Sequence, residues 1–99
     1  MHIISPKPLK QFWAKHPNAE TPLKSWLQTT RSAIWKGLVD TRRDFPHADL
    51  VGICTIFNIG GNKYRLVTKI YYPSKLVLIR FVLTHAEYDQ KGYKNDCEC

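Results

Sequence analysis

Apolar side chains recur at helical spacing in the first half of the chain. A short apolar start covers Met1–Ser5. In Pro6–His16 the apolar positions follow one another three or four residues apart, with Phe12 and Trp13 among them, and Pro17 ends the pattern. The sequence therefore predicts a short first strand followed by an amphipathic helix.

A second helix is predicted after this one. Thr21 suits its N-cap and Pro22 its first position, while Gly37 can end the helix after about Lys36. Over Thr41–Leu50 we expect a short basic turn or helix and then a loop. Because aromatic side chains dominate small cores, core packing is the expected role of all three tryptophans, which are Trp13, Trp26 and Trp35.

Strand signals replace the helical pattern in the second half. Three segments are rich in β-branched and aromatic residues: Ile53–Ile59, Lys63–Tyr72 and Leu76–Thr84. Turn sequences separate them, at Gly60-Gly61-Asn62 and Pro73-Ser74-Lys75. We expect these segments to form a three-stranded antiparallel meander.

The hairpin around Gly60-Gly61 fixes which strand side chains share a face. Either two-residue turn places Phe57 opposite Tyr64 or Leu66, and both registers preserve the same parity. The face expected under the helices carries Ile53, Phe57, Ile59, Tyr64, Leu66, Ile70 and Tyr72. The other face is basic and half polar, and it carries Asn58, Lys63, Arg65, Val67 and Lys69. A tight turn after Tyr72 would add Arg80 to this basic face, beside Val67.

Together these elements predict an α+β fold in which two N-terminal helices pack on one face of a small, mainly antiparallel sheet. Of the 99 residues, 43% are hydrophobic and 23% charged, a balance typical of a globular protein. We expect a single domain over residues 1–99, with residues 91–99 as a flexible tail.

An excess of basic residues points to anionic partners. The 15 Lys and Arg residues against 8 Asp and Glu give a net charge of +7, which favours nucleic acid, a membrane surface or an acidic protein. The sequence contains no recognisable transmembrane segment or signal peptide, so we expect a cytoplasmic protein without membrane contact. The three cysteines, Cys54, Cys97 and Cys99, make no disulfide framework, and we expect reduced thiols rather than metal ligands.

Groups that can move protons gather at the end of the last predicted strand. The segment Thr84–Asp89 contains an imidazole, a phenol and two carboxylates, at the rim of the basic sheet face. Cleavage of RNA through its own 2′-hydroxyl needs a base for that hydroxyl, positive charge at the phosphate and an acid for the departing 5′-oxygen. Arg65 and Lys63 can supply the charge, while His85 or Tyr88 can move the protons.

A purely structural interpretation competes with this one. His85 with its polar neighbours also suits a helix cap, and the basic strand positions also suit a solvated face. The remaining histidines are interpreted as structural or incidental, namely His2, His16 and His47.

Three stretches of the sequence resemble one known family. They are Met1–Ser5, Phe57–Val67 and Val82–Asp89, the last reading Val-Leu-Thr-His-Ala-Glu-Tyr-Asp. Together they are similar to the HigB branch of the RelE-type toxins. The resemblance implies the fold expected above and a toxin of a type II toxin–antitoxin pair. It further implies a ribosome-dependent endoribonuclease that cuts mRNA without a metal or other cofactor, through attack by the 2′-hydroxyl, and that is neutralised by a HigA-type helix-turn-helix antitoxin.

The resemblance also implies roles for single residues. Arg65 matches an arginine that contacts the scissile phosphate, while His85 and Tyr88 stand where relatives often carry an arginine and a tyrosine. With Lys63 these are the expected catalytic groups. We expect RNA contacts from Asn58, Lys69 and Arg80, and support for His85 from Glu87 and Asp89.

Two other functions are compatible with the sequence. A non-catalytic basic module that binds RNA or the ribosome would bind in a salt-sensitive way and leave RNA intact. A protein-interaction domain would use its positive surface to hold an acidic partner.

Overall fold

A five-stranded sheet forms the centre of the molecule, and the computed structural model describes residues 1–99. The strands are β1 (His2–Ile4), β2 (Asp49–Val51), β3 (Cys54–Ile59), β4 (Tyr64–Tyr71) and β5 (Leu76–Thr84). Their order across the sheet is β1-β5-β4-β3-β2, and only the β1–β5 pair is parallel. The meander of β3, β4 and β5 confirms the prediction, and Phe57 pairs with Leu66 in one of the two registers considered.

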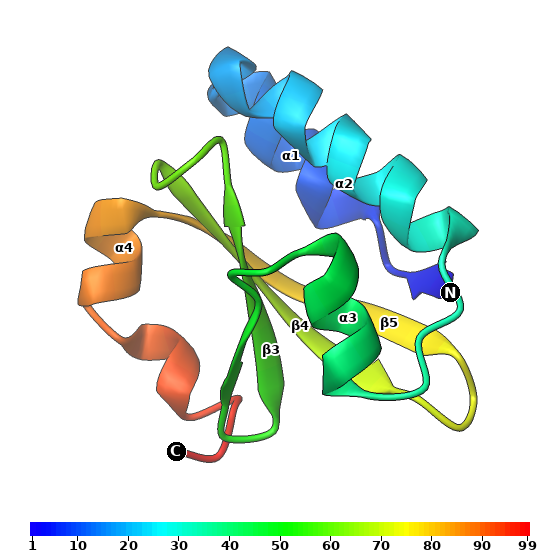
Figure 1. Ribbon diagram of the computed structural model, residues 1–99. Coiled ribbons are helices and arrows are strands. Elements are labelled where there is room, and N and C mark those ends of the chain that lie inside the picture. The colour runs from blue at the N-terminus through cyan, green and yellow to red at the C-terminus, as the bar shows by residue number, and fades with distance from the viewer.

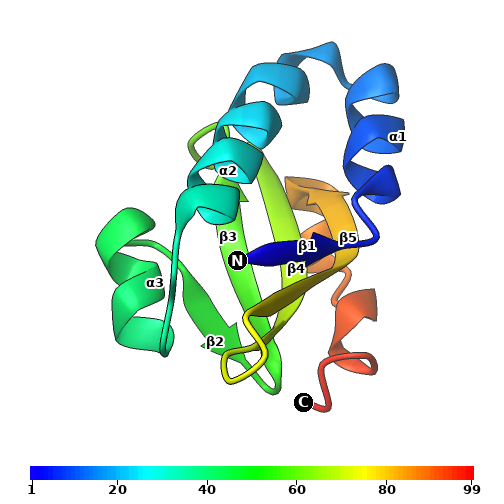
Figure 2. The same cartoon turned by 90° about the vertical axis from the view of Figure 1, so that its right-hand side faces the viewer.

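Helices lie on both sides of this sheet (Figure 1). They are α1 (Lys7–Lys15), α2 (Glu20–Ser32), α3 (Leu38–Asp44) and α4 (His85–Asp89), with 3₁₀ turns η1 (Pro17–Ala19) and η2 (Gly92–Lys94). Helices α1 and α2 run side by side over one face, while α4 and the C-terminal segment lie on the other side (Figures 1 and 2). The α+β arrangement predicted from the sequence is thus confirmed. None of the helices has the length and apolar character needed to cross a membrane.

The main core lies between α1, α2 and the sheet. Trp26 and Trp35 are buried, and both pack against Phe57 with ring centroids 5.3 and 6.2 Å away. Leu9 and Leu23 of the two helices are fully buried in the same cluster. Burial of each large apolar side chain of this kind stabilises the fold by about 1.5–3 kcal/mol.

The second helix is shorter than predicted. It begins at Glu20, so Thr21 lies inside it rather than at the N-cap, and it ends at Ser32 rather than near Lys36. The N-terminal amino group donates hydrogen bonds to backbone carbonyls at this end of the helix. The chain then continues in an extended conformation, which lets Trp35 enter the core.

A short edge strand replaces the loop that was predicted before β3. Strand β2 pairs with β3 through a two-residue connection, so that Val51 lies opposite Cys54. Gly52 opens this connection with φ +58°, a conformation that glycine adopts readily. Ile53, expected under the helices, lies in the connection and is 48% exposed.

The sheet face opposite α1 and α2 is apolar at its centre, where the sequence predicted a basic, half-polar surface. A second cluster forms there from strand and C-terminal residues: Cys54, Ile56, Val67, Tyr93 and Cys97. Residues 91–99, expected as a flexible tail, pack on this face with Tyr93 and Cys97 buried.

Cys54 and Cys97 form a disulfide, so the prediction of reduced thiols is wrong for this pair. The backbone N–H of Ile53 donates to the carbonyl of Cys97 at 2.9 Å. A Cβ at Gly52 would lie 1.9 Å from that oxygen, so only glycine allows this approach. The two cysteines are 43 residues apart in the sequence, and local patterns therefore could not reveal their contact.

Candidate functional site

A polar cavity of about 350 Å³ opens on the sheet face that carries the C-terminal segment. Strands β3 and β4 form its floor with Ile56, Asn58 and Arg65, and Tyr88 of α4 contributes a wall. The other wall comes from α3, the segment before β2 and the first residue of β2, through Arg42, Pro46, His47, Ala48 and Asp49. The cavity thus unites three residues predicted from the sequence, Asn58, Arg65 and Tyr88.

Arg65 is held in this cavity by the β3–β4 turn. Its Nη1 donates to the carbonyls of Asn62 at 3.1 Å and Tyr64 at 3.2 Å, and its Nη2 donates to Oδ1 of Asn62 at 3.1 Å. A guanidinium carries five N–H donors, so Nε–H and one Nη2 hydrogen stay free. No carboxylate forms an ion pair with Arg65. The result is a positioned cation with unused donors.

Tyr88 covers one side of this guanidinium, which lies 5.4 Å from the centre of its ring. The ring is carried by α4, whose first turn is closed by a capping box. The hydroxyl of Thr84 accepts from the N–H of Glu87 at 3.2 Å, and the Glu87 carboxylate accepts from the N–H of Thr84 at 2.8 Å. The structural interpretation predicted a helix cap in this segment, and the capping box confirms it, with Glu87 as one of its two members.

Arg42 and His47 belong to the cavity, although sequence reasoning did not select them. The Nε of Arg42 donates to the carbonyl of Ala48 at 2.9 Å, which ties the wall segment to α3. His47 is exposed on that segment and its ring makes no hydrogen bond within the protein. The sequence does contain one indication of this wall, which is Gly52. A two-residue hairpin turn that begins at this glycine would predict β2 and place the residues before it beside β3.

Two of the predicted catalytic residues lie outside the cavity lining. His85 and Lys63 are joined at the end of the sheet, where the N–H of His85 donates to the carbonyl of Lys63 at 3.2 Å. The Nδ1 of His85 lies 3.1 Å from Oδ2 of Asp89, and both side chains are exposed. Asp89, and not Glu87, is thus the carboxylate that contacts this imidazole.

The two basic residues Lys69 and Arg80 already have an acidic partner. Asp96 accepts from Arg80 at 2.7 and 2.8 Å, and Lys69 lies 3.5 Å away. The hydrogen bond from Arg80 lowers the pKa of Asp96, and the same bond raises the pKa of Arg80. A register shift in the β4–β5 pair places Phe81 opposite Val67, so Arg80 does not occupy the predicted position beside it.

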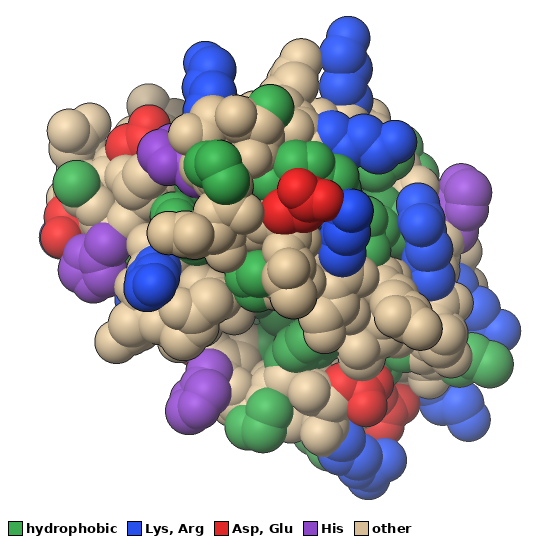
Figure 3. Space-filling view, turned by 90° about the horizontal axis from the view of Figure 1, so that it is seen from above, with side chains coloured by type: hydrophobic (Ala, Val, Ile, Leu, Met, Phe, Trp, Pro, Cys, Tyr) green, Lys and Arg blue, Asp and Glu red, His purple; other side chains and the backbone are tan.

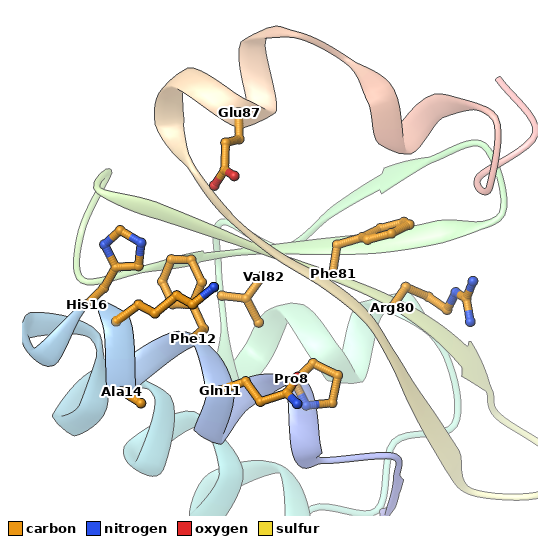
Figure 4. Close-up of a pocket in the computed structure, with 10 residues that line it drawn as sticks. Pro8, Gln11, Phe12, Ala14, His16, Arg80, Phe81, Val82 and Glu87 are labelled. Carbon is orange, nitrogen blue, oxygen red and sulfur yellow. The ribbon is translucent and has the colours of Figure 1, made fainter.

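A larger open cavity of about 680 Å³ lies between α1 and β5 (Figure 4). Phe12 and His16 reach it from the α1 side, Val82 from β5 and Glu87 from α4 (Figure 4). Arg80 points away from the other labelled side chains, and its guanidinium is held by Asp96. This cavity therefore lacks a free arginine, and the smaller polar cavity is the better candidate site.

Positive charge extends beyond the cavity. In the view of Figure 3, Lys and Arg side chains stand mainly along the upper and right-hand rim, and acidic side chains lie at the centre, at the lower right and at the left. The structure contains no group of three or more His, Cys, Asp or Glu side chains that could hold a metal ion. The groups that line the polar cavity are therefore guanidinium, imidazole, phenol and amide, together with the carboxylate of Asp49, which lies 3.6 Å from Arg42.

Comparison with known proteins supplies the context for this cavity. A family model described as HigB_toxin, RelE-like toxic component of a toxin-antitoxin system, matches residues 19–91. The chain is 34% identical over 92 residues to a protein of Escherichia coli K12 named mRNA interferase toxin HigB, which covers 90% of this chain and 88% of that relative. A protein of Escherichia coli O6:H1 named mRNA interferase HigB is 28% identical over 93 residues, 91% of this chain and 90% of the relative. All residues that line the polar cavity fall within the matched segment.

Proposed function

The chain belongs to the HigB family of RelE-like toxins, and we propose from this membership that it is an endoribonuclease that cleaves mRNA. As the toxic component of a toxin–antitoxin system, it has an antitoxin as partner. The polar cavity is the proposed active site. Its most informative feature is Arg65, a fixed cation with two free N–H donors and no carboxylate partner.

Arg65 suits the stabilisation of a phosphorane-like transition state. In the proposed reaction the 2′-oxygen of the RNA attacks the adjacent phosphorus, and the bond from phosphorus to the 5′-oxygen breaks. Negative charge grows on the non-bridging oxygens during this step, and two guanidinium donors can meet it at once. Arg42, on the opposite wall, carries a second guanidinium, whose Nη2 lies 3.6 Å from Oδ1 of Asp49, so Arg65 is the cavity's arginine without a carboxylate partner. The expected products are a 2′,3′-cyclic phosphate and a 5′-hydroxyl.

Two groups in the cavity can move the protons that this reaction transfers. His47 presents an unbonded imidazole from one wall, and Tyr88 presents a phenol from the other. One proton leaves the 2′-hydroxyl and another reaches the departing 5′-oxygen, so a pair of groups on opposite sides of the phosphate fits the requirement. We assign this pair of roles to His47 and Tyr88 ahead of His85, which lies outside the lining.

The proposal extends to the setting of the reaction. We place cleavage on mRNA bound to translating ribosomes in the cytoplasm, independent of a metal ion. The antitoxin is proposed to be a HigA-type protein with a helix-turn-helix domain. The net charge of +7 supports this setting, because mRNA and ribosomal RNA are polyanions.

The test is induction of the toxin in a bacterial host, with growth and mRNA integrity as readouts. Wild-type protein should stop growth and cut messages inside coding regions. Arg65→Ala and His47→Ala should each reduce the cleavage rate by about 100-fold, the size typical of a lost transition-state donor or proton-transfer group.

Matched variants keep this test specific. Arg31→Ala and His2→Ala remove an exposed arginine and histidine outside the cavity and should cleave as the wild type does. His85→Ala should reduce the cleavage rate less than His47→Ala does. The reverse order would assign the proton-transfer role to the imidazole of His85. Intact RNA after incubation of the wild type with translating ribosomes would favour the non-catalytic binding module.

A further inference from the structure

The C-terminal segment contacts the proposed active site although it lies outside the family match. The match ends at residue 91, and Tyr93 follows in η2. Tyr93 is only 5% exposed, and its ring stacks on that of Tyr88 with centroids 4.7 Å apart and planes 3° from parallel. Burial raises the pKa of Tyr93 above its ordinary range, with a further contribution from the Tyr88 hydroxyl, so Tyr93 stays a neutral phenol.

Tyr88 is therefore in contact with an aromatic ring on one side and a cation on another. Tyr93 contributes the ring, and Arg65 contributes the guanidinium, 5.4 Å from the ring centre of Tyr88. Helix α4 spans only five residues and contains no buried side chain. Short helices have little stability of their own, so a ring at its end needs outside contacts to keep one orientation.

Several bonds fix Tyr93 behind Tyr88. Downstream of it, Cys97 is joined to Cys54 of β3, and the Cys97 carbonyl accepts from the N–H of Ile53. Between Tyr93 and Cys97 in the sequence, Asp96 forms an ion pair with Arg80 of β5 at 2.7 Å. The segment is thus attached both to the floor of the site and to β5.

We propose that Tyr93 is a positioning residue that holds Tyr88 over Arg65, and that the Cys54–Cys97 disulfide keeps Tyr93 in place. The effect on cleavage rests on the proposed function. The effect on the position of Tyr88 does not, which allows the two to be tested separately.

The disulfide makes this arrangement sensitive to thiol reductants. A dithiol reductant that attacks the pair transfers two electrons: the S–S bond between Cys54 and Cys97 breaks, two thiols form there, and the reductant becomes a disulfide. Disulfides in a reducing cytoplasm are commonly transient. The reduced chain keeps the Asp96 ion pair but loses its covalent tie to β3, so Tyr93 and then Tyr88 gain freedom.

The direct test measures the Nε–H proton of Arg65 by NMR in the full-length protein. A guanidinium over an aromatic face experiences a ring-current shift, so this proton should resonate upfield in the wild type. Tyr93→Leu fills the apolar cluster without a ring, and it should move the signal toward the value of a free arginine. Tyr93→Phe keeps the ring and should restore the upfield position.

Activity and folding are measured on the same variants. Tyr93→Leu should reduce the single-turnover cleavage rate by about tenfold, as expected for partial loss of a well-placed proton-transfer group, with little change in the RNA concentration that half-saturates the enzyme. Tyr71→Leu, at an exposed tyrosine of β4, is the matched control. A thermal unfolding transition confirms that each variant is folded.

The outcomes separate the positioning role from the proposed function. An unchanged Arg65 signal in folded Tyr93→Leu overturns the positioning role, whether or not the protein cleaves RNA. A shifted signal in a protein whose wild type never cleaves RNA supports the positioning role and contradicts the proposed function.

Dithiothreitol tests the part assigned to the disulfide. The protein carries Cys99→Ser, which removes the one free cysteine, and is compared before and after reduction. Reduction and Cys97→Ser should both move the Arg65 signal in the direction of Tyr93→Leu and slow cleavage. Identical signals and rates in the oxidised and reduced protein would contradict the role of the disulfide.

Discussion

Arg65 keeps two N–H donors free because a turn, rather than a carboxylate, holds its guanidinium. Lys69 and Arg80 show the contrasting case on the same sheet face, since both are paired with Asp96. The presence of a basic side chain in the sequence therefore does not by itself predict a phosphate ligand. Whether its charge is available depends on acidic partners that are distant in the chain.

The Asp96 pair predicts a specific pH dependence of stability. Arg80 lowers the pKa of Asp96 below its ordinary 3.8, so the folded state binds this proton less readily than the unfolded state. The stabilisation is complete above pH 4 and is lost as the pH falls further through the folded-state pKa. Asp96→Asn should lower the free energy of unfolding at pH 7 by up to about 1 kcal/mol, because the pair is partly exposed to solvent.

Urea unfolding at several pH values checks this expectation. The difference between wild type and Asp96→Asn should shrink below pH 4. Glu98→Gln, at an exposed carboxylate outside any ion pair, is the control and should leave stability unchanged. A difference that stays constant down to pH 2 would show that the charge of Asp96 does not stabilise the fold.

Helix α4 places Tyr88 in the cavity and depends on its N-cap. Thr84→Ala removes the hydroxyl that accepts from Glu87, and loss of such a cap costs about 1 kcal/mol of unfolding free energy. Denaturant titration measures the loss, and the cleavage rate should fall with it because Tyr88 sits one turn further on. Thr21→Ala is the control. The sequence predicted an N-cap at Thr21, but this residue lies inside α2, so its replacement should lower the free energy of unfolding by less than Thr84→Ala does.

Elements with a strong local pattern could be predicted from the sequence. The two N-terminal helices and the three long strands follow from periodicity and turn residues. Strand parity predicts that Phe57, Tyr64 and Leu66 share a face, and the structure selects Leu66 as the partner of Phe57. Strand β2 lies where the sequence predicted a loop, because Asp, with which it begins, is disfavoured in strands and only two apolar residues follow. His47, just before it, was therefore interpreted as structural or incidental. Of the cavity residues, Asn58, Arg65 and Tyr88 were found because they lie on well-marked elements.

The arrangement of the C-terminal segment could not be predicted in this way. It depends on contacts with residues far away in the chain, between Cys97 and Cys54 and between Asp96 and Arg80. Spacing of cysteines in a sequence does not determine which pair is close in space. The covered apolar centre of the second sheet face was therefore unexpected as well.

The molecule has three layers: two helices, a sheet and a C-terminal segment on the opposite face (Figures 1 and 2). The polar cavity lies at the edge of that third layer, where charged and proton-moving groups from α3, the sheet and α4 meet. The net charge of +7 on the whole chain favours polyanionic partners such as RNA. These features are the basis of the proposed cleavage through the RNA's own 2′-hydroxyl.

The end groups of the cleaved RNA test this chemistry most directly. Full-length protein is incubated with mRNA on translating ribosomes, and both new ends are identified. We expect a 2′,3′-cyclic phosphate and a 5′-hydroxyl, produced about 100-fold more slowly by Arg65→Ala. Fragments that carry a 3′-hydroxyl and a 5′-phosphate, or a wild-type rate in Arg65→Ala, would contradict the proposed mechanism.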